Sequence, residues 1–376
     1  PSVSLFSSTA NADLTAFFKR MGCEASTNAY SIKGSTPLVD SLASVKYALY
    51  SEPVGNTDLM IYLRESGGTY LYQNLYTLPL GFLLPAGIED NWQYQMDNPA
   101  DVQNDLAFLL GADNVLSETA GEMDGSTFRF TADITGEYYI YVLNKRVDSA
   151  DASLPTGTLS FDNVDRGYFL ELGTIAEGNE VILTTASGQE LNAVAYRFSE
   201  RAMIDVYDKL SQQPLRLDSW TDTRLSGTIE ASERGTLFTS IPYDKGWTVT
   251  VDGKRAETRK IFDAFLAIDL PAGVHTIEFS YFPQGLAPGA AITTGAALIL
   301  LILILIRILM IRRRQVDRSQ KEAMRRWEMG EHRSRGRKSR PDEFWPDEEK
   351  PRPDEFWLDE DWNRDDTIKK NREEPS

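Results

Sequence analysis

The side chains that most often carry out chemistry in proteins are scarce in this sequence of 376 residues, which has one cysteine and two histidines. Cys23 alone cannot form a disulfide within the chain, and one cysteine with two histidines does not supply the four ligands of the usual zinc site. His275 alternates with Ile277 and Phe279, which predicts a structural place in a strand, and His332 lies near the C-terminus. We therefore predict no metal site and no redox centre.

Acidic side chains are abundant, but their spacing predicts no catalytic pair. Residues 1–311 contain 38 Asp and Glu, so some of them must fall on neighbouring strands by chance. Asp162 and Glu171 are two such acids, and nothing specific marks them as a glycosidase pair. The sequence also lacks G-x-S-x-G, H-E-x-x-H and a glycine-rich phosphate loop. We predict no catalytic residue within this chain.

Two aromatic stretches are the best candidates for contact with a ligand. Sugar rings stack on aromatic side chains, and neighbouring amides can bond their hydroxyl groups. This chemistry predicts a sugar-binding or substrate-binding role for Tyr72, Gln73, Asn74, Tyr243 and Trp247. Aromatic side chains at strand spacing are also typical of a β core, and that interpretation stays open.

The elements that must position these residues are mostly short strands. From Ser126 onward, runs of alternating apolar residues are separated by Gly, Asp and Asn, as in antiparallel β-sandwiches. We predict a mainly β fold, with a small α+β region over 1–119, a β-sandwich module over 120–200, a helical connector over 201–215 and a second β-sandwich module over 216–286. The clearest predicted strands are 136–143, 180–185, 192–198, 236–241, 247–251, 265–270 and 274–281.

An uncharged run of 20 residues, Ala287–Ile306, predicts a transmembrane helix over 287–311. At about 1.5 Å per residue the run spans about 30 Å, the thickness of the hydrocarbon core of a bilayer. Arg312, Arg313 and Arg314 follow it, whereas Gln284–Gly289 carry no charge. By the positive-inside rule, residues 1–286 are expected to be extracytoplasmic and the C-terminal tail cytoplasmic.

The residues after this helix, 312–376, are predicted to form a charged, disordered tail. The sequence Arg-Pro-Asp-Glu-Phe-Trp occurs at 340–345 and again at 352–357. Two copies are too few for a repeat protein, but each presents an aromatic pair that a cytoplasmic partner could bind. The predicted docking residues are Phe344, Trp345, Phe356 and Trp357. A solvated tail without a partner is the alternative.

The net charge of the chain is 39 − 56 = −17, and all of the excess precedes the tail. Residues 1–311 have 21 basic and 38 acidic side chains, while residues 312–376 have 18 of each. A surface of this charge repels polyanions. We expect no nucleic acid partner, and a polyphosphate polymer would need a local basic patch or bound divalent cations.

Several stretches resemble a known family in their residue identities as well as in their periodicity. They are Val39–Leu42 leading into Val45–Tyr47, Tyr72–Asn74 followed by Leu78–Phe82, Ser240–Trp247, Val251–Lys254 and Leu270–Ile277. In this order they resemble the external C-terminal region of the YfhO family of bacterial membrane proteins, in which a last transmembrane helix follows a closing β-sandwich. The resemblance covers about residues 1–311 and leaves the charged tail outside.

The resemblance implies a function in the bacterial cell membrane. The family is similar to GT-C-type glycosyltransferases, which are polytopic enzymes that take sugar from a polyprenyl-phosphate donor outside the cell. Its members are associated with adding sugars to cell-envelope polymers such as lipoteichoic or wall teichoic acid. The resemblance also implies that the catalytic acid, with a divalent cation as an option, belongs to a transmembrane portion that this chain does not contain.

The sequence begins at Pro1 without an initiator Met or a secretion signal, so we expect transmembrane segments upstream of it. Many segments with an acidic residue in an early external loop would favour the enzyme. A single anchor would favour the alternative, a non-enzymatic membrane-anchored β-sandwich protein that binds surface glycans or partner proteins.

Overall fold

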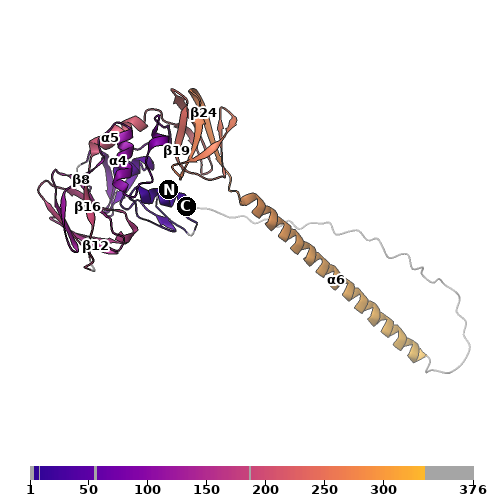
Figure 1. The fold of residues 1–376 in the computed structure, drawn as a ribbon. Helices are drawn as coiled ribbons and strands as arrows, with labels where there is room; N and C mark the ends of the chain where they lie inside the picture. Colours follow the sequence, from indigo (N-terminus) through magenta and orange to yellow (C-terminus); the bar gives the residue numbers. More distant parts are fainter. Residues whose placement is uncertain (1–3, 8, 55–56, 186–187, 335–376) are drawn as a thin grey trace, which may run out of the picture. The chain divides into compact units, whose positions relative to one another are not determined.

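The computed structural model of the protein describes residues 4–7, 9–54, 57–185 and 188–334. The chain divides after Ala291 into two compact units (Figure 1). The first unit contains the sheets and the short helices, and the second contains most of one long apolar helix. Because its described strands all pair in an antiparallel manner, the structure confirms the predicted mainly β fold class.

The N-terminal part of the first unit combines small sheets with helices that begin at capping residues. Asn11 Oδ1 accepts hydrogen bonds from the backbone of Asp13 and Leu14, and Asn98 Oδ1 caps a later helix in the same way. The helices are α1 (Ala12–Arg20), α2 (Pro37–Leu42), α3 (Ile88–Asn91) and α4 (Pro99–Leu109). The sheets have the orders β1 (Leu5–Phe6), β3 (Ala29–Tyr30), β2 (Ala25–Ser26) and β4 (Tyr47–Tyr50), β6 (Thr69–Asn74), β5 (Met60–Ser66).

The first sandwich consists of two sheets that enclose a core of alternating apolar side chains, among them Phe130, Ile140 and Leu183. One sheet has the order β13 (Gly157–Asp162), β12 (Ser149–Leu154), β15 (Glu180–Thr185), β10 (Thr127–Thr131), β9 (Gly121–Asp124). The other has the order β14 (Phe169–Ile175), β11 (Gly136–Val142), β16 (Ala193–Phe198), β8 (Leu116–Thr119). The 3₁₀ turn η1 (Val164–Arg166) precedes β14, and helix α5 (Glu200–Leu210) follows β16.

The second sandwich takes one strand from the N-terminal region. Strand β7 (Gly81–Leu83) pairs with β19 (Gly235–Pro242), so that Leu83 lies opposite Leu237. The sheet order is β22 (Thr258–Ile261), β23 (Phe265–Leu270), β19, β7. The facing sheet has the order β17 (Arg216–Trp220), β18 (Arg224–Ala231), β24 (Gly273–Tyr281), β20 (Trp247–Val251), β21 (Lys254–Ala256).

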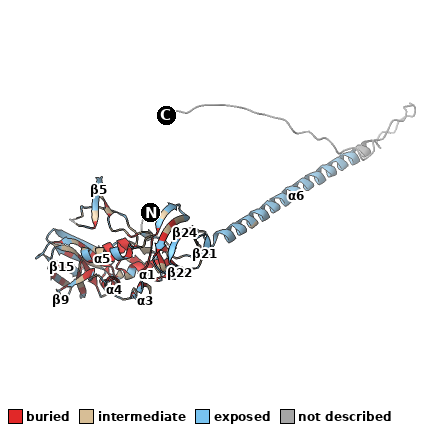
Figure 2. Cartoon of the chain, turned by 90° about the horizontal axis from the view of Figure 1, so that it is seen from above, coloured by how far each residue is buried: buried red, intermediate tan, exposed pale blue. Residues whose placement is uncertain are grey.

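A third core joins these parts into one unit. It includes Phe17 of α1 and Leu106 of α4, Tyr139 and Phe169 from the outer face of the first sandwich, and Phe265 of the second. Figure 2 shows these elements as a buried interior, from which β5 projects as a largely exposed hairpin. The outer face of the first sandwich is therefore an internal surface of the unit.

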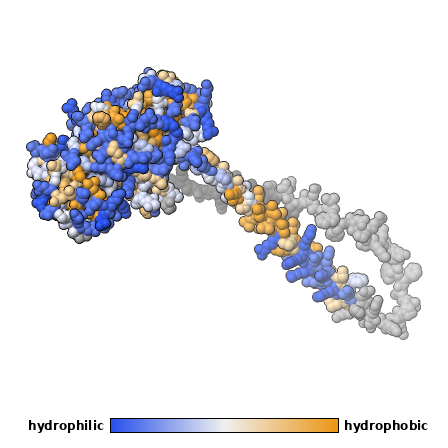
Figure 3. All heavy atoms as spheres, viewed as in Figure 1, coloured by the Kyte–Doolittle hydropathy of each residue, from blue (hydrophilic) through white to orange (hydrophobic). Residues whose placement is uncertain are grey.

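The second unit contains α6 (Leu286–Ser334), the one helix among the described residues that is long and apolar enough to cross a membrane. Figure 3 shows its apolar band followed by a hydrophilic stretch. Residues 312–334 are helical, whereas the sequence predicted disorder from residue 312. The reason is composition, since Arg, Lys, Gln, Glu, Ala and Met extend a nucleated helix at little cost. Residues 335–376 lie outside the described residues.

Candidate functional site

Carboxyl groups and tyrosines from six elements gather on the outer face of the first sandwich, where it meets the N-terminal region. Their charges lie close enough to act on one another's pKa values. We call this set the carboxyl–tyrosine cluster, and it consists of Asp40 (α2), Tyr50 (β4), Tyr72 (β6), Glu137 and Tyr139 (β11), Glu171 (β14) and Glu200 (α5).

Strands β11 and β14 supply the centre of the cluster. Glu137 and Tyr139 are two residues apart on β11 and so point to the same face, and Glu171 lies opposite Tyr139 on β14. The hydroxyl of Tyr139 donates a hydrogen bond to Glu137 Oε2 at 3.4 Å. The register shifts between Tyr138 and Tyr139, beside Gly173 at φ +71°, which is a backbone conformation that favours glycine. This bulge aligns Tyr139 with Glu171.

Asp40 and Glu200 are held differently. The Glu200 carboxylate accepts hydrogen bonds from the Thr57 hydroxyl and, at 3.0 Å, from the backbone N–H of Asp58. Asp40 is 9% exposed, and its Oδ1 makes no hydrogen bond within the described part of the chain. A buried oxygen without a donor is uncommon in folded proteins. Asp40 Oδ1 is therefore a buried oxygen without a donor among the described residues, whereas both oxygens of Glu200 are occupied.

The tyrosines form a continuous aromatic face on the sheet β4–β6–β5. The ring of Tyr72 contacts those of Tyr50 and Tyr62 edge to face, with centroids 5.6 Å apart in both cases. The Tyr72 hydroxyl accepts a hydrogen bond from the backbone N–H of Val54 at 3.2 Å. Burial, and then the Asp40 carboxyl, raises the pKa of Tyr50, so this phenol stays neutral at physiological pH.

Three carboxyl groups of the cluster hold their protons to an unusually high pH. Burial, and then the neighbouring Glu171 and Glu200, raises the pKa of Glu137 to about 7. Partial desolvation, and then Asp40, raises the pKa of Glu171 to about 7, although this residue is exposed. Burial raises the pKa of Asp40 to about 6, and Glu137 adds to that effect while a bond from Ser35 opposes it.

The described residues that shift these three pKa values include no Lys or Arg. Partly protonated carboxyl groups and neutral phenols both donate and accept hydrogen bonds. Such a set suits a ligand with many hydroxyl groups and an apolar ring face, as in a sugar, and it repels phosphate.

The structure places the predicted residues Tyr72, Gln73 and Asn74 on β6, and only Tyr72 belongs to the cluster. Asn74 is buried and bonds two backbone segments, since its Nδ2 donates to Val45 O before β4 and its Oδ1 accepts from Tyr76 N. Gln73 points to the opposite face of the sheet from Tyr72. Contact of these residues with a glycan stays a prediction.

The other predicted pair lies in the second sandwich. Tyr243 follows β19 and packs against its core, and Trp247 begins β20 with its ring centroid 5.0 Å from that of Tyr281 and 6.5 Å from that of Phe279. These residues and those of β6 belong to different sheets. Ligand contact by Tyr243 and Trp247 also stays a prediction, and Phe344, Trp345, Phe356 and Trp357 lie outside the described residues.

His275, Asp162 and Glu171 were not predicted to be functional residues, and the structure shows where each of them lies. His275 Nδ1 lies 2.8 Å from Asp252 Oδ2, and its Nε2 lies 3.1 Å from the carbonyl oxygen of Pro271. Asp162 and Glu171 lie on different sheets of the first sandwich. Within the described residues, no group of three or more His, Cys, Asp or Glu is arranged to hold a metal ion.

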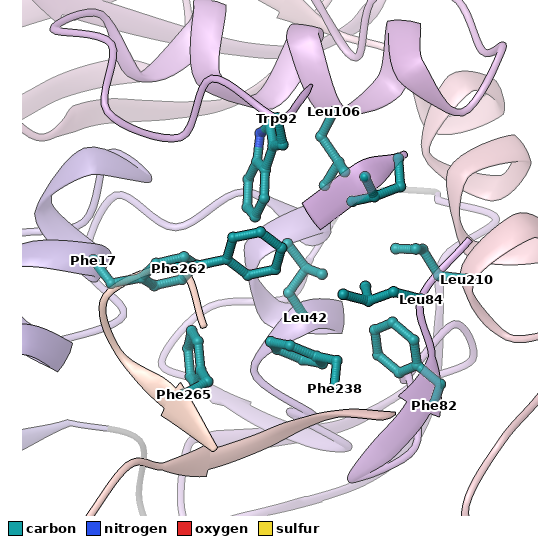
Figure 4. Close-up of a pocket in the computed structure, with 11 residues that line it drawn as sticks. Phe17, Leu42, Phe82, Leu84, Trp92, Leu106, Leu210, Phe238, Phe262 and Phe265 are labelled. Carbon is teal, nitrogen blue, oxygen red and sulfur yellow. The ribbon is translucent and has the colours of Figure 1, made fainter. Parts of the chain in front are cut away.

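A separate apolar cavity of about 20 Å³ lies in the core that joins the parts of the first unit (Figure 4). Its lining consists of aromatic and aliphatic side chains only, including Phe17, Trp92, Phe238 and Phe262. A void of this size holds about one water molecule and lacks the polar partners that a water needs. We interpret it as a packing feature of the core.

Sequence reasoning missed Asp40, Glu137, Glu171 and Glu200 as a group. They come from positions up to 160 residues apart, because 200 − 40 = 160. One local signal was available, since Glu137 stands two residues before Tyr139 in a run whose other members are apolar or aromatic. A carboxyl on that face must be buried or face a partner.

Comparison with known proteins gives a family match over most of the chain and one curated relative over a shorter part. The family model described as "Bacterial membrane protein YfhO" matches residues 1–116 and 113–293. The uncharacterized protein YfhO of Bacillus subtilis (strain 168) is 30% identical over 112 residues, which cover 30% of this chain and 11% of that protein. The match thus spans a small part of the relative's length.

Among solved structures, the arabinofuranosyltransferase AftD from Mycobacteria matches 38% of this chain and 12% of its own, with 13% identity and a TM-score of 0.17. A second structure of AftD gives 14% identity and the same TM-score. Scores this low do not establish a common fold.

Proposed function

The chain belongs to the YfhO family of bacterial membrane proteins, and on this premise we propose that it is the extracytoplasmic C-terminal part of a polytopic, GT-C-like glycosyltransferase. The enzyme transfers sugar from a polyprenyl-phosphate donor to a cell-envelope polymer such as lipoteichoic or wall teichoic acid. In this proposal, helix α6 anchors the chain, the first unit lies outside the cell, and Arg312, Arg313 and Arg314 lie on the cytoplasmic side.

The carboxyl–tyrosine cluster is the observation that carries a role in sugar recognition. Its tyrosine face and its proton-sharing carboxyl groups provide the two kinds of contact by which proteins hold sugars, namely ring stacking and hydrogen bonds to hydroxyl groups. The free acceptor oxygen of Asp40 has no donor within the described chain, and a sugar hydroxyl would supply one. We assign the acceptor side of the reaction to this cluster.

Charge decides which part of the acceptor the cluster holds. The acids that act on one another there repel phosphate, so the sugar or polyol hydroxyl groups of the polymer contact the cluster and its phosphates lie elsewhere. The donor phosphate and any divalent cation are assigned to the transmembrane portion of the protein, together with the catalytic acid.

Sugar transfer by the longer protein that contains this chain tests the proposal. Membrane vesicles with and without the protein are supplied with a polyprenyl-phosphate-linked radiolabelled sugar and with purified lipoteichoic acid. The proposal predicts label on the polymer only in vesicles that contain the protein. The same assay with wall teichoic acid distinguishes the two acceptors.

The non-enzymatic alternative predicts a different pair of results. A membrane-anchored glycan-binding protein would retain the polymer on vesicles without transferring label to it. Retention without transfer, across the common bacterial sugars, would overturn the enzymatic proposal and leave a surface-binding protein.

A further inference from the structure

The sheet β4–β6–β5 has an exposed apolar face opposite its tyrosine face. Tyr47 and Leu49 on β4 are 53% and 70% exposed, and Ile61 and Leu63 on β5 are 49% and 43% exposed. We call these four side chains, with the half-buried Leu71 of β6 between them, the apolar outer face. Large apolar side chains gathered on one sheet face are unusual on a soluble surface and mark a contact.

The pairing register separates this face from the candidate site. Leu49 lies opposite Leu71 and Ile61 opposite Gln73, whereas Tyr62 lies opposite Tyr72 on the other face. One side of the same small sheet therefore carries the tyrosines of the cluster, and the other side carries apolar groups that the described residues leave exposed.

Hydrogen bonds tie this sheet to the second sandwich, whose last strand leads into α6. Just before β4, the hydroxyl of Ser44 lies 3.1 Å from that of Ser240 on β19. Six residues after Ser240, the carbonyl of Gly246 accepts a hydrogen bond from Phe282 N at 3.0 Å. Only residues 282–285 separate β24 from α6, which is at most about 14 Å of extended chain.

We propose that the apolar outer face rests in the interfacial layer of the bilayer that α6 crosses. Because α6 anchors the chain, the bilayer and the sheet belong to one assembly, which raises the effective concentration of lipid above that of a soluble partner. The inference concerns membrane contact and does not depend on sugar transfer.

The composition of the face fits the interface better than a protein partner. Tyrosine, Leu and Ile are combined with Lys46, whose Nζ lies 5.5 Å from the centroid of the Tyr47 ring, and with the exposed Arg64. Aromatic rings beside cationic side chains are characteristic of the level of lipid headgroups. Because β4 and β5 are edge strands with unpaired backbone groups, only their side chains are expected to enter the lipid.

A single fluorescent label tests this contact in the full chain. The only cysteine, Cys23, is fully buried and burial raises its pKa well above the ordinary value, so an introduced cysteine is labelled selectively. Leu49→Cys is labelled with an environment-sensitive dye, and Phe108→Cys on α4, where Phe108 is 74% exposed, is the matched control. Both variants are reconstituted through α6 into phosphatidylcholine–phosphatidylglycerol vesicles with nitroxide-labelled headgroups.

We expect the dye at position 49 to shift to shorter wavelength and to lose at least half of its emission to the nitroxide, while the dye at position 108 changes little. Equal quenching at the two positions would overturn the proposal. A wavelength shift without quenching would also overturn it, because the face would then contact protein, either a partner or a second copy. An Ile61→Cys variant repeats the test on β5. It shows whether the result at position 49 comes from a local disturbance of β4 by the dye.

Discussion

Glu171 on β14 lies directly opposite Tyr139 on β11, on the face of the first sandwich that packs against the N-terminal region. Glu171 lies beside a buried phenol, and Glu137 is hydrogen-bonded to the same phenol. Partial burial of two carboxyl groups in this way lowers the free energy of unfolding. Among the described residues, no Lys or Arg lowers the pKa values of these acids, so they hold protons instead. The cluster thus destabilises the folded protein, as is common for sites that bind ligands.

The first prediction is that stability falls as the pH rises from about 5 to 8. The pKa values of Asp40 and Glu137 are raised from 3.8 to about 6 and from 4.5 to about 7. Between these limits the folded protein binds more protons than the unfolded chain, so the free energy of unfolding decreases with pH. The midpoint of thermal unfolding in detergent, measured from pH 5 to pH 8, checks this.

The variant Glu137→Gln isolates the cause. A neutral amide loses no proton, so its unfolding midpoint should decline less with pH and should exceed that of the wild type at pH 8. Glu122→Gln, at an exposed position on β9, is the matched control and should follow the wild type. A wild-type midpoint that rises with pH would contradict the assignment of raised pKa values.

A second prediction concerns the joint between the first sandwich and the N-terminal region. Phe169 is fully buried, and its ring contacts those of Tyr139, Tyr141 and Tyr196. Phe169→Ala should lower the free energy of unfolding by about 3–5 kcal/mol in urea titrations, because it removes these contacts and leaves a cavity. Leu159→Ala, on the exposed side of β13, should stay within about 0.5 kcal/mol of the wild type. Similar losses in both variants would refute the shared core.

A third prediction concerns the part of α6 that follows the apolar band. Amide hydrogens of residues 316–330 should exchange slowly when the chain is in lipid nanodiscs, since they are bonded within the helix. Gln320→Pro removes one donor and breaks the helix, so residues after 320 should exchange faster while those before 312 do not change. Gln320→Ala is the control. Fast exchange of this stretch in the wild type would contradict a continuous helix.

Local signals predicted much of the fold. The predicted strands 136–143 and 180–185 match β11 and β15, and Asn11 and Asn98, a residue type that favours helix caps, stand before α1 and α4. Strand β7 escaped prediction because its three residues are all buried and show no alternation. Strand β12 escaped because Ala and Ser alternate there with little contrast in polarity. Strand β7 is fixed by β19, far away in the sequence, and β12 by β13 and β15.

The candidate site was harder to predict than the fold. Tyr72 was identified from its aromatic neighbours, but its carboxyl partners come from α2, α5 and the first sandwich. Only the packing of these elements raises the pKa values that mark the site. Asn74, which looked like a ligand-binding amide, bonds the backbone of Val45 before β4 and of Tyr76 in its own turn, an arrangement that a linear sequence does not reveal.

The most direct test of the proposed function is the Michaelis constant for the acceptor polymer in sugar transfer by the longer protein, wild type against the double variant Glu137→Gln and Glu171→Gln. Loss of two carboxyl groups that donate and accept hydrogen bonds should raise this constant by at least about tenfold, which corresponds to about 1.4 kcal/mol, with little change in kcat. Thermal unfolding of the double variant at pH 8 checks that misfolding does not explain the loss. An unchanged Michaelis constant, with Glu122→Gln as the reference, would contradict the assignment of the acceptor to this cluster.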